Sequence, residues 1–245
     1  MKKTAFLLFA CLFFIQAFSQ VTVDNPVPTT KTIKLPNRPA DHLMLQLSSD
    51  HWTGMPDSIS SHQSGFSRGF NAYFMLDKPF RSSPKYSIGF GLGISSSNIV
   101  FKKMNVGIEG APPVLHFTAE DSTSHFQKYK LSTSYAEVPI EFRFTSNPDN
   151  VNKSLKAAIG VKVGTLLNTH TKGKTLQDKN NTTINSFAEK INSKRFMNTT
   201  RFTATARLGY GIFSIFGSYQ LNNLLKDGAG ADMKLYQIGI TLSGL

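Results

Sequence analysis

The chain has 245 residues and a formal net charge of +12, with 27 Lys and Arg against 15 Asp and Glu. Its one cysteine, Cys11, lies close to the N-terminus. Disulfides, thiolate metal sites and cysteine nucleophiles are therefore excluded from the rest of the chain. The positive charge indicates an anionic partner, or alternatively the solubility of exposed loops.

The first 19 residues have the pattern of a cleaved export signal. Lys2 and Lys3 precede the apolar run Ala5–Ile15, and Ala17 and Ser19 occupy the small-residue positions before a cleavage site. An uncleaved N-terminal membrane anchor is the alternative, but the run is short for a bilayer span. We expect residues 20–40, which are rich in proline, to form a periplasmic N-terminal segment, and residues 41–245 to form one domain.

That domain is predicted to consist of strands. From Tyr86 to Ser95, bulky apolar residues alternate with glycine and serine, so one face of the strand is apolar and the other almost bare. The small face suits the interior of a narrow barrel and the apolar face suits lipid. Eight such runs occur, at Leu43–His51, Ser67–Asp77, Tyr86–Ser97, Lys130–Phe144, Leu155–Leu167, Arg201–Tyr210, Phe213–Leu221 and Leu235–Leu242.

Connections between these runs alternate in length. Three are short: Asp77–Lys85, Thr145–Ser154 and the turn at Gly211–Ile212. Four are longer and polar, at Trp52–Phe66, Asn98–Lys128, Asn168–Thr200 and Asn222–Lys234. Short turns at one end and long loops at the other predict an all-β fold, an eight-stranded up-and-down antiparallel transmembrane β-barrel. A soluble lipocalin-type barrel is the alternative. The loops Asn98–Lys128 and Asn168–Thr200 are expected to hold little apolar surface.

Charged residues are predicted on the inner face of this barrel. Because an unpaired buried charge is unfavourable, Glu137, Glu141, Arg143, Lys162 and Arg207 are expected to pair across the interior. Lys156 and Lys162 lie on the strand next to the two glutamates, so cross-strand pairs with them are within reach. The set is either a polar conduit or a salt-bridged plug, and eight strands leave little room for water. The predicted interior set is Arg68, Glu137, Glu141, Arg143, Lys156, Lys162, Arg201 and Arg207.

Enzyme chemistry is not indicated. Two glutamates could act as a glycosidase pair, but cationic neighbours would keep both ionised, which does not suit a general acid. A rim hydrolase would have to use Asp50, His51 and His170. We expect no catalysis, no cofactor and no metal.

A basic loop provides the other candidate site. Phosphates of lipopolysaccharide are a plausible target for it, and a disordered solvated loop is the alternative. Its members are Lys172, Lys174, Lys179, Lys190, Lys194 and Arg195.

Four segments carry a family resemblance: Leu131–Phe144, Ala158–Gly164, Thr205–Gly211 and Tyr236–Leu245. Through them the chain resembles the outer-membrane β-barrel family of Bacteroidota that includes the PorT-like proteins. The resemblance implies the outer membrane as location and brings no catalytic residues. We expect a structural or surface-interaction role through long extracellular loops, with outer-membrane lipid, lipopolysaccharide or an envelope protein as partner and no nucleic acid. A barrel subunit of a protein-secretion or envelope-assembly machine is the alternative.

Overall fold

A computed structural model describes residues 43–64, 67–109, 113–120, 122 and 124–244. All described residues belong to one compact unit, which lies within Leu35–Leu245. The predicted export signal and the segment 20–40 lie outside the described residues, so they stay predictions. No helix in the described part of the chain is long and apolar enough to cross a membrane.

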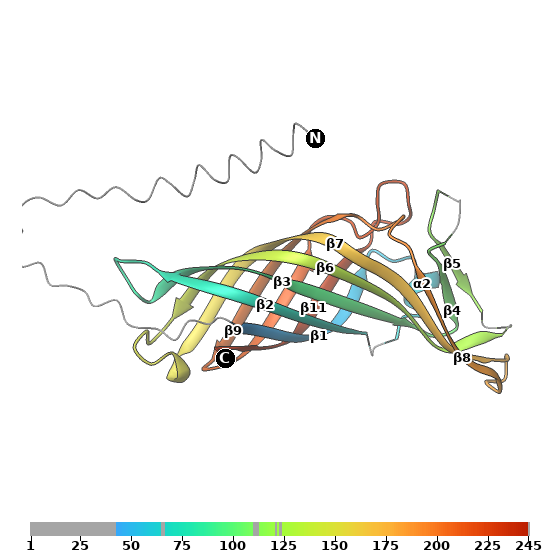
Figure 1. Ribbon diagram of the computed structural model, residues 1–245, viewed down its shortest axis with the longest axis horizontal. Coiled ribbons are helices and arrows are strands. Elements are labelled where there is room, and N and C mark those ends of the chain that lie inside the picture. The colour runs from blue at the N-terminus through green and yellow to red at the C-terminus, as the bar shows by residue number, and fades with distance from the viewer. Residues whose placement is uncertain (1–42, 65–66, 110–112, 121, 123, 245) are drawn as a thin grey trace, which may run out of the picture. The chain divides into compact units, whose positions relative to one another are not determined.

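Eight antiparallel strands close into a ring in the order β1-β2-β3-β6-β7-β9-β10-β11, with β11 paired back to β1 (Figure 1). The ring strands are β1 (Leu43–Thr53), β2 (Arg68–Pro79), β3 (Tyr86–Phe101), β6 (His125–Thr145), β7 (Leu155–Gln177), β9 (Thr200–Tyr210), β10 (Phe213–Gln220) and β11 (Lys234–Ser243). Each of the eight predicted runs lies within one of these strands, except that the second run begins one residue before β2 and the seventh ends one residue after β10. The predicted fold is confirmed.

Alternation along the strands separates the two faces of the ring. On β3, Ile88, Phe90 and Leu92 are exposed on the outside. Equivalent apolar side chains of the other ring strands form a continuous apolar belt around the barrel. A belt of this kind faces lipid, because the strands cross the bilayer core with their apolar side chains outward.

Three strands continue well beyond the belt, contrary to the prediction of loops there. Part of Asn98–Lys128 and much of Asn168–Thr200 is strand. β8 (Thr183–Asn192) folds back on β7 as an added edge strand. We call the region formed by residues 96–101, 125–135, 168–177 and 183–192 the platform. The hairpin of β4 (Met104–Gly107) and β5 (His116–Ala119) and the short helix α2 (Asp57–Ser60) lie at the same end (Figure 1).

This loop end also holds the largest apolar core, which corrects the expectation that the long loops have little apolar surface. Ile99, Phe101, Met104 and Val106 from the first long segment are buried together with Phe196 from the other. Further members come from the remaining connections and strand ends, among them Trp52, Ile59, Leu224, Leu225 and Met233. Buried contacts between connections explain why these segments are ordered: each supplies apolar residues that no single loop could bury alone.

The opposite end is simple by comparison. Its connections are short turns, one of which contains the 3₁₀ helix η2 (Val151–Lys153). The barrel therefore has a long-loop end, where the platform and the apolar core lie, and a short-turn end.

Candidate functional site: the barrel interior and a lysine face

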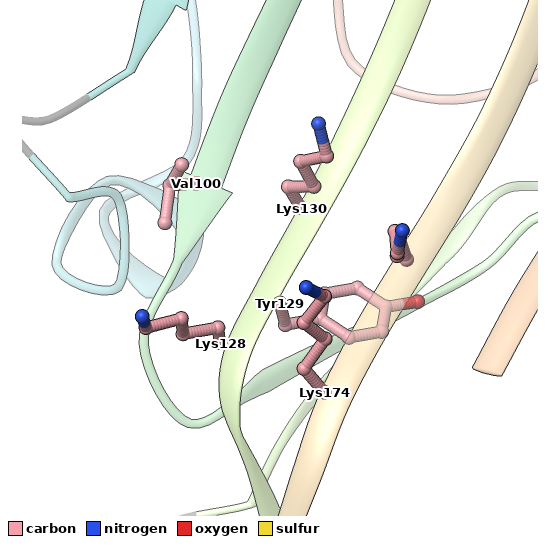
Figure 2. A pocket seen from close by; sticks show the side chains of 6 residues that line it. Val100, Lys128, Tyr129, Lys130 and Lys174 are labelled. Atoms are coloured by element: carbon pink, nitrogen blue, oxygen red, sulfur yellow. The ribbon is translucent and has the colours of Figure 1, made fainter. Parts of the chain in front are cut away.

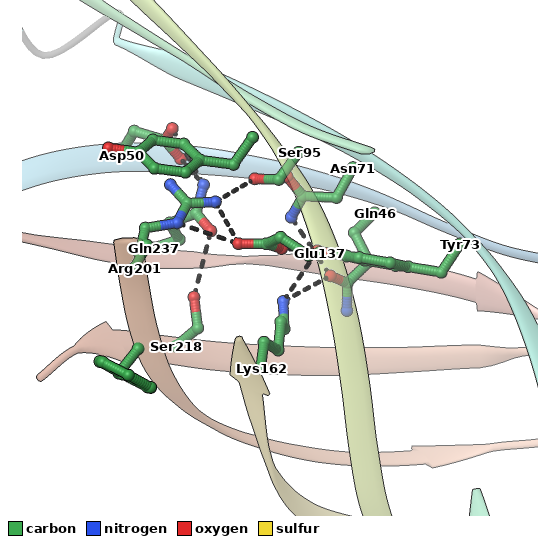
Figure 3. A network of polar contacts seen from close by, with 12 residues as sticks. Gln46, Asp50, Asn71, Tyr73, Ser95, Glu137, Lys162, Arg201, Ser218 and Gln237 are labelled. Carbon is green, nitrogen blue, oxygen red and sulfur yellow. Dashed lines mark hydrogen bonds and ion pairs between the residues drawn. The ribbon is translucent and has the colours of Figure 1, made fainter. Parts of the chain in front are cut away.

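Glu137 is the centre of a polar network inside the barrel (Figure 3). Arg201 forms an ion pair with it across the interior, and the Arg201 Nη2 also donates to Ser95 Oγ at 2.7 Å. The hydroxyl of Tyr73 donates to Glu137 Oε2 at 2.6 Å. Lys162 Nζ donates to that hydroxyl at 3.2 Å and to Gln46 Oε1 at 3.3 Å. The network around this carboxylate thus joins side chains of six strands, β1, β2, β3, β6, β7 and β9.

A second cluster lies toward the short-turn end. Arg143 Nε and Arg207 Nη2 each donate to Glu141 Oε2 at 2.9 Å. Arg143 also forms an ion pair with Asp77, with Nη1 and Oδ1 3.5 Å apart. Both glutamates are therefore neutralised by arginines. Arg143 and Arg207 belong to the set that was expected to pair across the interior, whereas Lys162 donates to the Tyr73 hydroxyl. The planar guanidinium presents several donors at fixed angles and suits such buried pairs.

Seven of the eight predicted interior charges lie inside the barrel, and Arg68 does not. Arg68 is exposed on the outer face of β2, next to Asn98 of β3. The period of β2 explains this placement, since Arg68 has the same parity as the outward-facing Phe70 and Phe74. Lys156 is buried on β7.

Glycines on β3 and β7 make room for these charged side chains, as their spacing indicated. A Cβ placed on Gly89 would lie 2.4 Å from Nε of Arg143, and one on Gly164 would lie 2.9 Å from Cγ of Glu137. A side chain at either position would displace the network. The interior is filled by side chains packed against bare backbone.

The three residues proposed for a rim hydrolase lie apart. Asp50 is buried inside and accepts two hydrogen bonds of 3.0 Å from Gln237 Nε2. The ring of His51 stacks on Tyr236, with centroids 5.2 Å apart. His170 lies on β7, which is not a neighbour of β1 in the ring. Within the described residues no three His, Cys, Asp or Glu side chains are arranged to hold a metal ion.

Half of the predicted basic loop becomes part of an ordered lysine face on the platform. Lys172 lies opposite Lys190 of β8. Lys172 and Lys174 of β7 also lie opposite Lys130 and Lys128 of β6. Lys179 lies in the turn between β7 and β8, and Lys194 and Arg195 follow β8, so these three do not belong to the lysine face.

Sequence reasoning missed Lys128 and Lys130 as members of this face. A signal was present, because Lys128-x-Lys130 and Lys172-x-Lys174 repeat the same period of two. It was hidden by a register shift at Ser134/Tyr135, where Leu167 is an extra residue of β7. The shift changes which parity of β7 faces outward, and continuous alternation would place Lys172 and Lys174 inside.

A ring of eight strands with an apolar belt outside and paired charges inside defines a small transmembrane β-barrel. The model of the family described as outer membrane protein beta-barrel domain matches residues 42–226, and the chain belongs to that family. Among solved structures, the crystal structure of Ail, the attachment invasion locus protein of Yersinia pestis, matches with 15% sequence identity. That match covers 82% of this chain and 94% of the other, with a TM-score of 0.32. No curated protein matches the chain.

Proposed function

We propose that this chain is a non-enzymatic outer-membrane barrel that acts at the cell surface through its platform. The observation that carries the proposal is the difference between the two ends. β6 and β7 run 21 and 23 residues, roughly twice the 9–11 residues that a membrane strand needs. The additional length is a sheet supported by an apolar core, and rigidly supported surfaces of this kind commonly carry binding functions.

A structural or binding role is favoured over transport by the filled interior. The Glu137 and Glu141 clusters occupy the barrel between its ends, and a buried, paired network is unfavourable to open. Export by cleavage after Ser19 is part of the proposal, and intact-mass measurement of the mature protein tests it.

A shortened hairpin tests the surface role. Replacing Thr175–Phe187 by Asn-Gly joins the paired residues Lys174 and Ala188 through a favoured two-residue turn. We expect this variant to insert normally but to lose cross-linked surface partners in intact cells, while deletion of residues 20–40 leaves them unchanged.

The opposite result would support a PorT-like role in secretion. In that case the working surface would be residues 20–40 with the short turns. Deleting residues 20–40 would then impair secretion of other proteins, and the shortened hairpin would have no effect.

A further inference from the structure

The lysine face of the platform has the properties of an anion site. We define the lysine ladder as Lys128 and Lys130 of β6, Lys172 and Lys174 of β7, and Lys190 of β8. Their register makes three opposite pairs: Lys130 with Lys172, Lys128 with Lys174, and Lys172 with Lys190. Figure 2 shows four of the lysine side chains around one hollow.

Like charges in directly opposite positions destabilise a sheet. The register rows of this face, within the described residues, contain no Asp or Glu: the row beside the ladder is Asn98, Ser132, His170 and Asn192. Burial lowers the pKa of the Lys130 ammonium, and the charges of Lys172, Lys174 and Lys190 lower it further. An anion bound between the lysines would relieve this repulsion.

The ladder is also hollowed and partly fixed in position. A hollow of about 290 Å³ is lined by Val100, Tyr129 and four of the lysines, and Arg68, Asn98, Val100 and Lys130 line a neighbouring one. Asn98 Oδ1 accepts a hydrogen bond of 2.7 Å from Lys130 Nζ. The lysine is thereby held at the border of both hollows.

Position relative to the belt indicates which anion fits. On β7 the last belt residue is Leu167, five positions before Lys172. With a rise of about 3.3 Å per residue and a tilt near 45°, the ladder lies roughly 10–15 Å beyond the apolar belt. Phospholipid headgroups occupy only about 5–8 Å on each side of the hydrocarbon. A phosphate on a larger, sugar-bearing headgroup would reach the ladder.

We propose that the lysine ladder binds a phosphate group of a phosphorylated glycolipid, such as lipopolysaccharide, in the outer leaflet next to the barrel. The proposal rests on the surface orientation of the platform given under the proposed function. The proposed phosphate site contains no residue from the tip of the β7–β8 hairpin.

The test uses the full mature chain in phosphatidylcholine nanodiscs containing a few per cent lipopolysaccharide. The ladder variant carries Lys130→Gln, Lys172→Gln and Lys190→Gln. Its matched control carries Lys179→Gln, Lys194→Gln and Lys226→Gln, which remove the same charge from exposed positions elsewhere. Bound glycolipid is counted by native mass spectrometry, and the gel shift on boiling verifies folding of each variant.

Each lysine near an anionic surface contributes roughly fivefold in affinity, so we expect the ladder variant to bind about a hundredfold more weakly. The control and the shortened hairpin should bind like the wild type. Equal losses in the ladder variant and the control would overturn the proposal, as would undiminished binding of chemically dephosphorylated lipopolysaccharide. Equal binding of phosphatidylglycerol would overturn the assignment to a glycolipid. Because the shortened hairpin keeps the ladder, failure of the surface role and failure of this site give different results.

Discussion

At the scale of single residues, the barrel depends on a few buried charges that are each held by several partners. Glu137 is 1% exposed and receives hydrogen bonds from Tyr73 and Arg201. The guanidinium of Arg201 also lies 4.1 Å from the ring centroid of Tyr135. A buried charge is tolerated only when its partner is present. Removing one member of the Glu137–Arg201 pair should therefore destabilise the barrel more than removing both members.

A double-mutant cycle on Glu137 and Arg201 measures this dependence. Arg201→Met alone should lower the free energy of unfolding by about 3–5 kcal/mol, because it leaves a buried carboxylate unpaired. Adding Glu137→Leu should restore part of the loss. Denaturant unfolding, followed by the gel mobility of the folded barrel, gives the values. Additive losses in the double variant would show that the two charges act independently.

His170 reports the field of the lysine ladder. Burial lowers the pKa of the His170 imidazole, and the charges of Lys190, Lys130 and Lys172 lower it further. Protonation of His170 is therefore disfavoured in the folded protein, and Lys190→Ala should raise its pKa toward the usual value. Titration of the imidazole by NMR measures the shift. Lys179→Ala is the control, and an unchanged pKa in Lys190→Ala would show that Lys190 does not act on this ring.

At the scale of elements, strand periodicity predicted the eight ring strands and the inner position of most charges. Each side chain in these strands faces either lipid or the interior, and the residue type indicates which: the bulky Phe90 is exposed outside, and the small Gly89 faces the interior beside Arg143. The platform could not be predicted in this way. Its segments of β7 and β8 follow the extra residue Leu167, and the apolar core at this end joins residues from four separate connections. The local alternation of apolar and polar residues shows neither where a bulge reverses the outward face of a strand nor which distant residues meet in a core.

The bare inner face of β3 makes a specific prediction. Gly89→Ala would place a methyl group against the guanidinium of Arg143, which pairs with Glu141 and Asp77. We expect it to destabilise the barrel by about 1–3 kcal/mol through overpacking. Gly217→Ala is the matched control, because a Cβ there has nothing within 4 Å. If both variants unfold at the same denaturant concentration, the glycines do not make room for the network.

At the scale of the whole molecule, side chains fill the space between the strands in two places. Paired charges fill the barrel interior, and the apolar core at the long-loop end contains large buried side chains such as Trp52, Phe101 and Tyr135. An eight-stranded barrel has an interior just wide enough for side chains to fill. The molecule therefore combines a membrane segment filled by side chains with the platform, which lies beyond the belt at the long-loop end.

Conductance measurements test the seal. In planar bilayers the purified barrel should show no stable channel, because its interior is occupied by ion pairs such as Glu141 with Arg207. A porin of similar preparation is the positive control. Steady open channels of reproducible size would contradict a closed interior.

The central claim, a transmembrane barrel with its platform at the cell surface, is tested most directly by cysteine labelling. The chain without its first 19 residues has no cysteine, so single cysteines can be introduced without background. With a membrane-impermeant maleimide on intact cells, Lys179→Cys should be labelled at once. Asn147→Cys in a short turn should react only after the outer membrane is permeabilised, and Ile159→Cys in the apolar belt should stay unlabelled in both cases. Labelling of Asn147→Cys but not Lys179→Cys on intact cells would contradict the orientation, and ready labelling of Ile159→Cys would contradict the membrane barrel itself.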